Sequence, residues 1–261
     1  QHCHRGGPVD EDLASAQELG AIFRELWPPV VQVSGGEPLL RDDVLDVIQS
    51  LRQPDGSPYI ILVTNGSLLT PDGFRQTRDA GVDAYSISLD YPDERHDEFR
   101  MIPGLFHHLQ ELIASLSPEE RCAVTLNCVV QSDNFRDTLP LAHLARDWGV
   151  NMNYSPYTWL RTDDKKYVPA KEDLPELREI FEEVLDFQKR HDTVKSSATF
   201  LNNIVAFFDD REIPGCRAGE RFLVVNPDGT LSPCGLITMA FPDRPALLEG
   251  FSKGNTCTHC N

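Results

Sequence analysis

Short apolar runs alternate with amphipathic segments along most of this chain, from about residue 21 to residue 190. An apolar run followed by a segment of helical periodicity is typical of a βα unit, and successive units of this kind build a parallel sheet. The apolar runs predict five strands, at residues 30–34, 59–64, 83–89, 123–130 and 150–155.

The segments between these strands carry helical signals. The i, i+3, i+4, i+7 spacing that gives a helix one apolar face occurs at Val44, Val47, Ile48 and Leu51, and again at Leu177, Ile180, Phe181 and Val184. Thr70 followed by Pro71 is a typical helix start, and Gly81 is a typical helix end. Gly149 ends a further helix, predicted at residues 139–148, in the same way.

Five strands, with one more expected upstream of Gln1, predict an α/β fold: a partial (β/α)6 TIM-like barrel over residues 1–195. The pattern changes after residue 195, where two short apolar runs flank Asp228 and Gly229. Asp-Gly between apolar runs is a strong hairpin signal. We therefore predict a small second module of β-hairpin and helix over residues 196–261.

Composition and charge exclude some classes of function. With 261 residues, 40% of them hydrophobic and 25% charged, the chain can bury a large core. No apolar run reaches the ~18 residues that cross a bilayer, and no signal peptide precedes the fold, so we expect a cytoplasmic protein without a membrane partner. The formal net charge of −17 argues against a nucleic-acid partner, because Lys and Arg must displace counterions from a phosphate backbone.

The seven cysteines are spread unevenly. Those in the last fifth of the chain are Cys216, Cys234, Cys257 and Cys260. Grouped thiols in a reducing compartment favour metal binding over disulfides. Cys122 and Cys128 instead share the apolar side of the strand at residues 123–130, which favours buried small hydrophobes over ligands.

Small and polar residues follow the predicted strands, where parallel α/β folds collect their functional residues. The first strand leads into Gly35, Gly36 and Glu37 of "SGGEP". The glycines permit close approach of a ligand to the backbone, and the carboxylate can hold an ammonium group. A simple turn is the alternative, both here and for Asn65 in the "TNG" segment after the second strand.

The third and fourth strands place polar residues on one face. Alternation along "SISLD" puts Ser86, Ser88 and Asp90 on the same side. The same rule puts Thr125 and Asn127 together in the fourth strand. Small polar groups on the inner face of a barrel suit a ligand that carries a ribose and a carboxylate.

Four segments in order, "CHRGG" and then "SGGEP", "TNG" and "SISLD" at successive strand ends, resemble the radical S-adenosylmethionine (SAM) superfamily. That family carries C-x-x-x-C-x-Φ-C, with Φ usually aromatic, in the loop after its first barrel strand. Cys3 is similar to the third cysteine and His2 to Φ. The first two cysteines and the first strand are missing, for which we favour truncation over a natural start that lacks the cluster.

The resemblance implies a cofactor set. Three cysteines, Cys3 among them, would bind a [4Fe-4S] cluster and leave one iron for the amino and carboxylate groups of SAM. The reduced cluster would cleave SAM to a 5′-deoxyadenosyl radical, while the protein orients the reactants and excludes water. The resemblance assigns cofactor contacts to His2, Gly35, Gly36, Glu37, Asn65, Ser88, Asp90 and Asn127.

The cysteine-rich end favours a subclass. Cys216 and Cys234 flank the predicted hairpin, and Cys257 and Cys260 belong to "CTHC". Four thiols that end in C-x-x-C bind structural zinc as readily as an iron-sulfur cluster. Together with the barrel, however, "GCRAGERFLVVNPDGTLSPCG" resembles the SPASM and twitch extensions of the superfamily, which implies an auxiliary [4Fe-4S] cluster on these four cysteines.

The loop after the fifth strand offers candidate substrate contacts. Tyr157, Trp159 and Asp163 are candidates for lining a pocket between SAM and the auxiliary cluster. We assign a catalytic role to Tyr157 and Asp163, because oxidation of a substrate radical needs a proton acceptor. An ordinary barrel rim is the alternative. Arg100 either pairs with an acidic group near SAM or lies on a helix surface.

Two enzymatic functions fit this set of motifs, and both use hydrogen-atom abstraction. One modifies a peptide or protein side chain, as in ribosomal-peptide maturation, and this is the one we favour. The other is a small-metabolite dehydrogenase. Either oxidoreductase would need a reducing partner such as flavodoxin or ferredoxin. A hypothesis of another class is a zinc-stapled barrel that only binds its partner and performs no radical chemistry.

Overall fold

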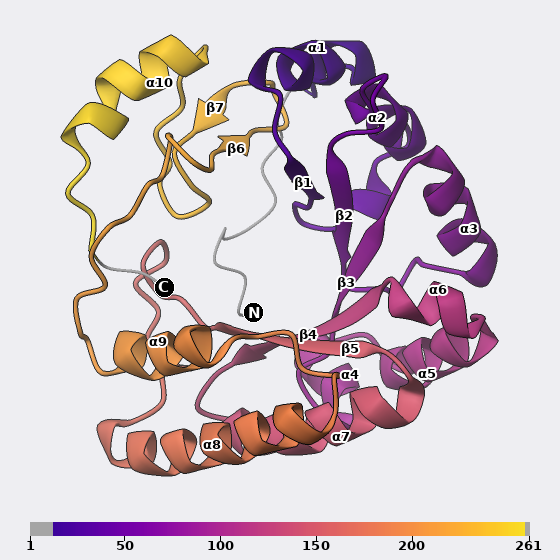
Figure 1. The fold of residues 1–261 in the computed structure, drawn as a ribbon, viewed down its shortest axis with the longest axis vertical. Coiled ribbons are helices and arrows are strands. Elements are labelled where there is room, and N and C mark those ends of the chain that lie inside the picture. Colours follow the sequence, from indigo (N-terminus) through magenta and orange to yellow (C-terminus); the bar gives the residue numbers. More distant parts are fainter. Residues whose placement is uncertain (1–12, 259–261) are drawn as a thin grey trace.

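Five parallel strands form the central sheet of the computed structural model, which describes residues 13–258. The strands are β1 (Val30–Val33), β2 (Tyr59–Thr64), β3 (Ala84–Ser88), β4 (Val124–Val130) and β5 (Asn151–Pro156). Each pairs in parallel with the next along the chain, and the sheet curves so that one face looks inward (Figure 1). The predicted α/β fold with a parallel sheet is confirmed.

Helices follow the outside of this curved sheet (Figure 1). They are α1 (Ala16–Leu26), α2 (Val44–Leu51), α3 (Pro71–Ala80), α4 (Arg95–Arg100), α5 (Leu105–Ser115), α6 (Pro118–Cys122), α7 (Thr138–Trp148) and α8 (Leu174–Arg190). The start and end predicted for α3 are confirmed. The Thr70 hydroxyl accepts a hydrogen bond from the Gly73 N–H (3.0 Å), and Gly81 ends the helix at φ 123°, a conformation that favours glycine.

The outer face of the sheet forms the main core. Leu62, Ile87, Leu126 and Met152 point from their strands toward the helices, and each has an exposed fraction of zero. The register places Ile87 beside Leu126 and Leu126 beside Met152. Full burial of such a side chain contributes about 1.5–3 kcal/mol. This face is therefore a principal source of stability.

The inner face carries half-buried polar side chains on β3, β4 and β5. Ser88 on β3 lies beside Asn127 on β4, which lies beside Asn153 on β5. Ser86 and Ser155 belong to the same face. The alternation predicted for β3 and β4 is confirmed up to Ser88 and Asn127.

The chain after α8 closes the open side of the sheet (Figure 1). Its elements are α9 (Ala198–Phe208), the antiparallel hairpin of β6 (Val224–Val225) and β7 (Leu231–Ser232), and α10 (Arg244–Gly250). The predicted hairpin is thus confirmed. Its turn returns to the start of the described chain, where the Ala14 N–H donates to the Pro227 carbonyl (2.8 Å).

The main core does not end at residue 195, where we placed the domain boundary. Buried side chains of α9, including Leu201 and Phe208, belong to the same core as the sheet. α9 packs against both α8 and β5. The core therefore continues past residue 195 into α9. The division of the chain into two domains stays a prediction.

One cysteine prediction is confirmed and one is wrong. Cys128 is fully buried, and this burial raises the pKa of its thiol, so it acts as a small hydrophobe. Cys122 is exposed because it ends α6, and β4 begins only at Val124. No helix among the described residues combines the length and the apolar composition needed to cross a membrane.

Candidate functional site

Glu37 joins the ends of β1 and β2. Its Oε1 accepts hydrogen bonds from the Thr64 hydroxyl (2.7 Å) and the Leu39 N–H (3.2 Å), and its Oε2 accepts from the Asn65 N–H (2.8 Å). The "SGGEP" and "TNG" segments are therefore held together by the Glu37 carboxylate. An ionised carboxylate offers about four acceptor positions. The described residues fill three of these positions and leave one for a further donor, such as an ammonium group.

Gly35 and Gly36 border this junction. Both are exposed, and a Cβ placed on either would meet nothing within 4 Å. Neither has the left-handed φ that would make glycine necessary for the turn. The two glycines instead leave open space beside the backbone at the carboxyl edge of β1. A ligand can fill that space, as the sequence predicts.

A series of hydrogen bonds crosses the inner face from β4 to β5. Asn127 donates from Nδ2 to Ser155 Oγ (3.1 Å) and accepts at Oδ1 from Asn153 Nδ2 (3.4 Å). Asn153 Oδ1 accepts from the Ser196 hydroxyl, which accepts from the Tyr154 N–H (3.0 Å). These bonds orient the Asn127 amide. One N–H and one acceptor position of that amide remain for a ligand.

Asp90 does not join this inner face, contrary to the sequence prediction. Its exposed fraction is zero, and its Oδ2 accepts from Arg100 Nε (2.8 Å) and Nη2 (2.6 Å). Its Oδ1 accepts from the Val129 N–H (3.1 Å). Strand β3 ends at Ser88, so the alternation rule does not reach Asp90. In this structure Asp90 connects α4 to β4, and Arg100 is its partner.

His96 lies against Asp90 and is also fully buried. The Asp90 N–H donates to His96 Nδ1 (3.2 Å), so the ring proton belongs on Nε2, which has no hydrogen-bond partner among residues 13–258. Burial lowers the pKa of His96 to about 4, and the ring is neutral at pH 7. Nothing in the polar segment around His96 indicates its burial.

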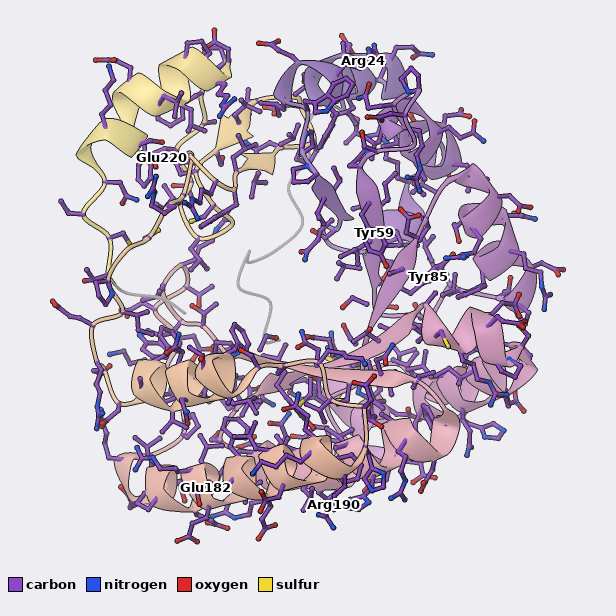
Figure 2. The ribbon with its side chains drawn as sticks, in the orientation of Figure 1. Arg24, Tyr59, Tyr85, Glu182, Arg190 and Glu220 are labelled. Carbon is purple, nitrogen blue, oxygen red and sulfur yellow. The ribbon has the colours of Figure 1, made fainter. Side chains whose placement is uncertain are left out.

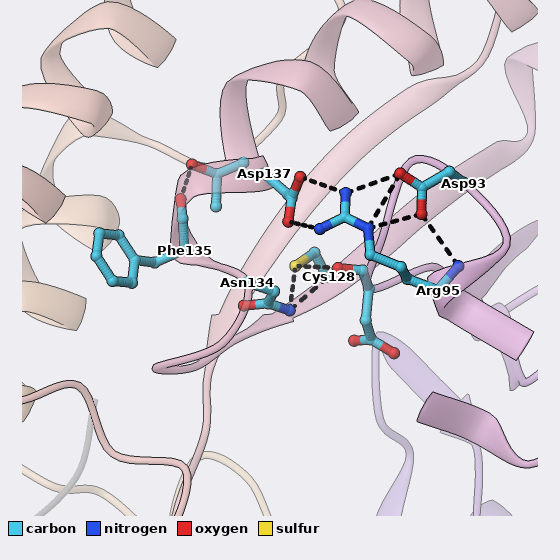
Figure 3. Close-up of polar contacts among 8 residues, drawn as sticks. Asp93, Arg95, Cys128, Asn134, Phe135 and Asp137 are labelled. Carbon is cyan, nitrogen blue, oxygen red and sulfur yellow. Dashed lines mark hydrogen bonds and ion pairs between the residues drawn. The ribbon is translucent and has the colours of Figure 1, made fainter. Parts of the chain in front are cut away.

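A second polar cluster joins the loops that follow β3 and β4 (Figure 3). Arg95 donates to the carboxylate of Asp93 (Nε to Oδ1, 2.8 Å) and to that of Asp137 (Nη2 to Oδ1, 2.8 Å). Asn134 donates to Cys128 Sγ (3.5 Å) and to backbone carbonyls at the ends of both strands. These contacts hold the carboxyl ends of β3 and β4 in place. Arg95 and Asn134 are not among the site residues predicted from the sequence.

The two predicted catalytic residues are not brought together. Tyr157 is 3% exposed, and its hydroxyl donates to the Asp164 carbonyl (2.8 Å) while its ring packs on Tyr167. Burial raises the pKa of this hydroxyl. Asp163 is exposed on a turn with φ 56°. Tyr157 thus packs against Tyr167 in this structure, and the proton-accepting role of Tyr157 and Asp163 stays a prediction.

A cavity of about 190 Å³ separates the loop after β5 from the hairpin. Its lining includes Arg161, Asp228 and Cys234. Arg161 Nη1 donates to the carbonyl of Gly235 (3.1 Å), which links the two parts of the chain directly. Trp159, predicted to line a substrate pocket, lies instead beside a second hollow with Phe207.

The model of the radical SAM superfamily matches residues 1–130. These residues include the loops at the ends of β1, β2 and β3. The chain belongs to the radical SAM superfamily. An AdoMet-dependent heme synthase of Methanosarcina barkeri is 32% identical over 54% of this chain and 39% of that protein. One from Oleidesulfovibrio alaskensis is 28% identical over 97% of this chain and 73% of that protein. The chain thus spans from about two fifths to three quarters of these relatives.

A solved structure shares the fold of this chain. The crystal structure of Streptococcus suis SuiB bound to the precursor peptide SuiA superposes with a TM-score of 0.70. The match covers 92% of this chain and 58% of that chain at 16% identity. Likeness at this level of identity shows the fold alone.

Membership of the radical SAM superfamily implies a [4Fe-4S] cluster and SAM. The open space beside Gly35 and Gly36, the remaining acceptor position of Glu37 and the oriented amide of Asn127 fit a polar ligand such as SAM. The predicted cluster ligand Cys3 and its neighbour His2 lie outside the described residues.

The cysteines of the C-terminal module are described in part. Cys216, Cys234 and Cys257 are half-buried free thiols, and Cys260 lies outside the described residues. Asn255 connects two of them: it donates to the Cys216 carbonyl (3.1 Å) and accepts from the Cys257 N–H (3.0 Å). Within residues 13–258, no three potential ligand side chains are close enough to hold a metal ion. The described thiols alone therefore do not form the auxiliary site.

Proposed function

We propose that this radical SAM protein reductively cleaves SAM and oxidises or rearranges its substrate by hydrogen-atom abstraction. The junction at Glu37 carries the proposal. Its hydrogen bonds bring the open glycine backbone and the Asn65 turn to one edge of the sheet. The half-buried polar residues Ser88 and Asn127 lie on the inner face of the next two strands.

The residues of this chain bind and orient the cofactor. When bound, the reduced cluster and SAM supply the 5′-deoxyadenosyl radical. The acceptor position left on Glu37 receives the methionine ammonium group, and the backbone at Gly35 and Gly36 lets the methionine approach closely. Asn127, held by Ser155 and Asn153, offers a donor and an acceptor to the ribose.

Asp90 contributes to cofactor binding only indirectly. Because Arg100 and the Val129 N–H occupy its carboxylate, we assign it a positioning role rather than a contact with SAM. It fixes the turn that follows Ser88, so the end of β3 stays aligned with β4. The cofactor contacts that we propose from the described residues are therefore Gly35, Gly36, Glu37, Asn65, Ser88 and Asn127.

For the substrate, we propose a peptide side chain. The small cavity near the hairpin suits a single side chain, and SuiB, which shares the fold, was solved with a precursor peptide. A small metabolite is the second candidate, because AdoMet-dependent heme synthases are among the sequence relatives. Either substrate is oxidised or rearranged after loss of a hydrogen atom.

We also propose an auxiliary [4Fe-4S] cluster on Cys216, Cys234, Cys257 and Cys260. The thiol chemistry and the Asn255 bridge between two of these positions support it. Iron, sulfide and zinc analysis of the anaerobically reconstituted full-length protein tests this assignment. Iron near two cubanes supports it, and a variant with Cys257→Ala should lose about half of the iron. Zinc alone would favour the zinc-stapled binding protein.

Reductive cleavage of SAM is the direct test of the proposed activity. The reconstituted full-length protein, SAM and dithionite, which stands in for flavodoxin or ferredoxin, should form 5′-deoxyadenosine. Cys3→Ala should abolish this product, and Glu37→Gln should weaken SAM binding. Glu182→Gln is the matched control, because Glu182 lies on the outside of α8 (Figure 2). Product formation by Cys3→Ala would contradict the assignment of Cys3.

A further inference from the structure

The cavity of about 190 Å³ beside the hairpin is lined mainly by polar residues. Sites that enclose a whole small-molecule ligand usually measure about 300–1,000 Å³. This cavity is therefore sized for one substituent or one side chain of a larger substrate. The chemistry of its lining determines which group can bind.

Arg161 supplies the positive charge of the lining. It is half-buried, and its one hydrogen bond to a described residue goes to the Gly235 carbonyl (3.1 Å). It forms no ion pair within residues 13–258. A guanidinium carries five N–H donors in a planar fork that matches a carboxylate. Most of its donors are thus available to a ligand.

Ser232 supplies a neutral donor to the same cavity. Its side chain is buried, and its hydroxyl oxygen accepts from Asn226 Nδ2 (2.9 Å). Asn226 also donates to the Thr230 hydroxyl oxygen (3.0 Å), and that hydroxyl donates to Asp228 (2.7 Å). The Ser232 hydrogen, unlike that of Thr230, has no acceptor assigned within this network. It can therefore donate to a bound anion.

Asp228 limits how much negative charge the cavity accepts. Its Oδ1 accepts from the Thr230 N–H (2.9 Å) and hydroxyl, and these bonds lower the pKa of Asp228. The carboxylate is exposed at the hairpin turn and is charged at neutral pH. Together with the overall charge of −17, it repels anions. An anion can bind only where Arg161 outweighs this repulsion.

We propose that this cavity binds a carboxylate group of the substrate, with the Arg161 guanidinium as its main partner and the Ser232 hydroxyl as a second donor. This deepens the proposed function and rests on it, since it names the chemistry of the substrate. The carboxylate belongs either to a small metabolite or to an acidic side chain of a peptide. Both carry the same group into the space between the barrel and the hairpin.

Glutarate is the probe for the small-molecule source, and acetyl-Ala-Glu-Ala-amide is the probe for the peptide source. Each is titrated calorimetrically into the anaerobically reconstituted full chain at constant ionic strength. Saturable binding of either probe at millimolar concentration is expected, and the tighter probe identifies the source. If neither probe binds, the proposal is overturned.

Substitutions locate the bound carboxylate. Arg161→Gln should weaken binding about 10- to 100-fold, as expected for loss of hydrogen bonds to a charged group. Arg161→Lys keeps the charge without the planar fork, so its loss should be intermediate. Arg190→Gln changes an exposed arginine at the end of α8 (Figure 2) and should have no effect. Unchanged binding by Arg161→Gln would overturn the proposal.

Asp228→Asn distinguishes an effect of charge on binding from an effect of a loosened hairpin. Arg161→Gln also removes the bond to Gly235, and a loosened hairpin would weaken binding for that reason alone. Asp228→Asn removes a repulsive charge and should tighten binding, an effect that loosening cannot produce. Weaker binding by this variant would contradict the proposal. SAM cleavage without a probe is measured in parallel, so failure of the proposed function is seen independently.

Discussion

The two faces of the central sheet differ sharply although they come from the same strands. On β4, Leu126 points outward and has an exposed fraction of zero, while its neighbour Asn127 points inward and is half-buried. The outer face packs against helices, and the inner face carries a series of side-chain hydrogen bonds. Because side chains alternate along a strand, residues that stabilise the core and residues that we propose to bind the ligand are neighbours in the sequence.

This division breaks down at the carboxyl edge of β3. Asp90, which follows β3, and His96, which belongs to α4, are polar, yet both are fully buried. Buried polar groups are tolerated when they have partners, and Asp90 has Arg100 and the Val129 N–H. The edge therefore combines burial with charge, and it is where a substitution should have the largest effect.

Asp90→Ala should cause the largest loss of stability. It leaves the Arg100 guanidinium, whose side chain is 16% exposed, without a counter-charge. Removal of one partner from a buried pair costs about 3–5 kcal/mol. Urea unfolding measures this loss. Asp186→Ala, which removes an exposed carboxylate on α8, is the control and should leave the midpoint unchanged.

Leu126→Ala tests the outer face. The substitution leaves a cavity between β4 and the helices, and a buried Leu→Ala change costs about 2–5 kcal/mol. The free energy of unfolding in urea should fall by this amount. SAM binding should be retained at temperatures where the variant is folded. A negligible loss would mean that the outer face is not a principal source of stability.

His96 should make stability depend on pH. Its pKa is about 6.5 in the unfolded chain and about 4 in the folded one, mainly because of burial. Between these values the unfolded state binds more protons, so stability rises with pH. The contribution is complete above pH 6.5 and is lost as pH falls toward 4, by up to roughly 3 kcal/mol.

The variant His96→Asn removes the titrating ring and keeps an acceptor for the Asp90 N–H. Its free energy of unfolding should change less between pH 7.5 and pH 5 than that of the parent chain. Parallel pH profiles for the two proteins would show that His96 is not the group responsible.

Asn127→Ala should have the smallest effect on stability. It removes hydrogen bonds to Ser155 and Asn153 from a half-buried position, which costs about 1 kcal/mol. SAM binding, measured by equilibrium dialysis of the reconstituted protein, should weaken several-fold. If this variant lost as much stability as Leu126→Ala, the inner face would contribute as much to stability as the outer face.

Local pattern was sufficient for most of the elements and for the faces of the strands. The prediction for Cys122 was wrong although a local signal for the preceding helix is present in the sequence. Ser117 and Glu120 form a capping box that begins α6, and the spacing S-x-x-E in the sequence indicates such a start. Recognition of this helix would have placed Cys122 outside the strand. No comparable signal exists for the burial of His96.

The amino-acid sequence is sufficient to predict the order of the strands, the hairpin and the apolar side of each strand. These properties follow from periodicity and turn chemistry over a few residues. Three contacts are evident only in the folded protein: that of Glu37 with Asn65, that of Asp90 with Arg100 in place of the inner face, and that of Arg161 with Gly235. Such contacts depend on where strands end and how distant loops approach, which no local pattern specifies.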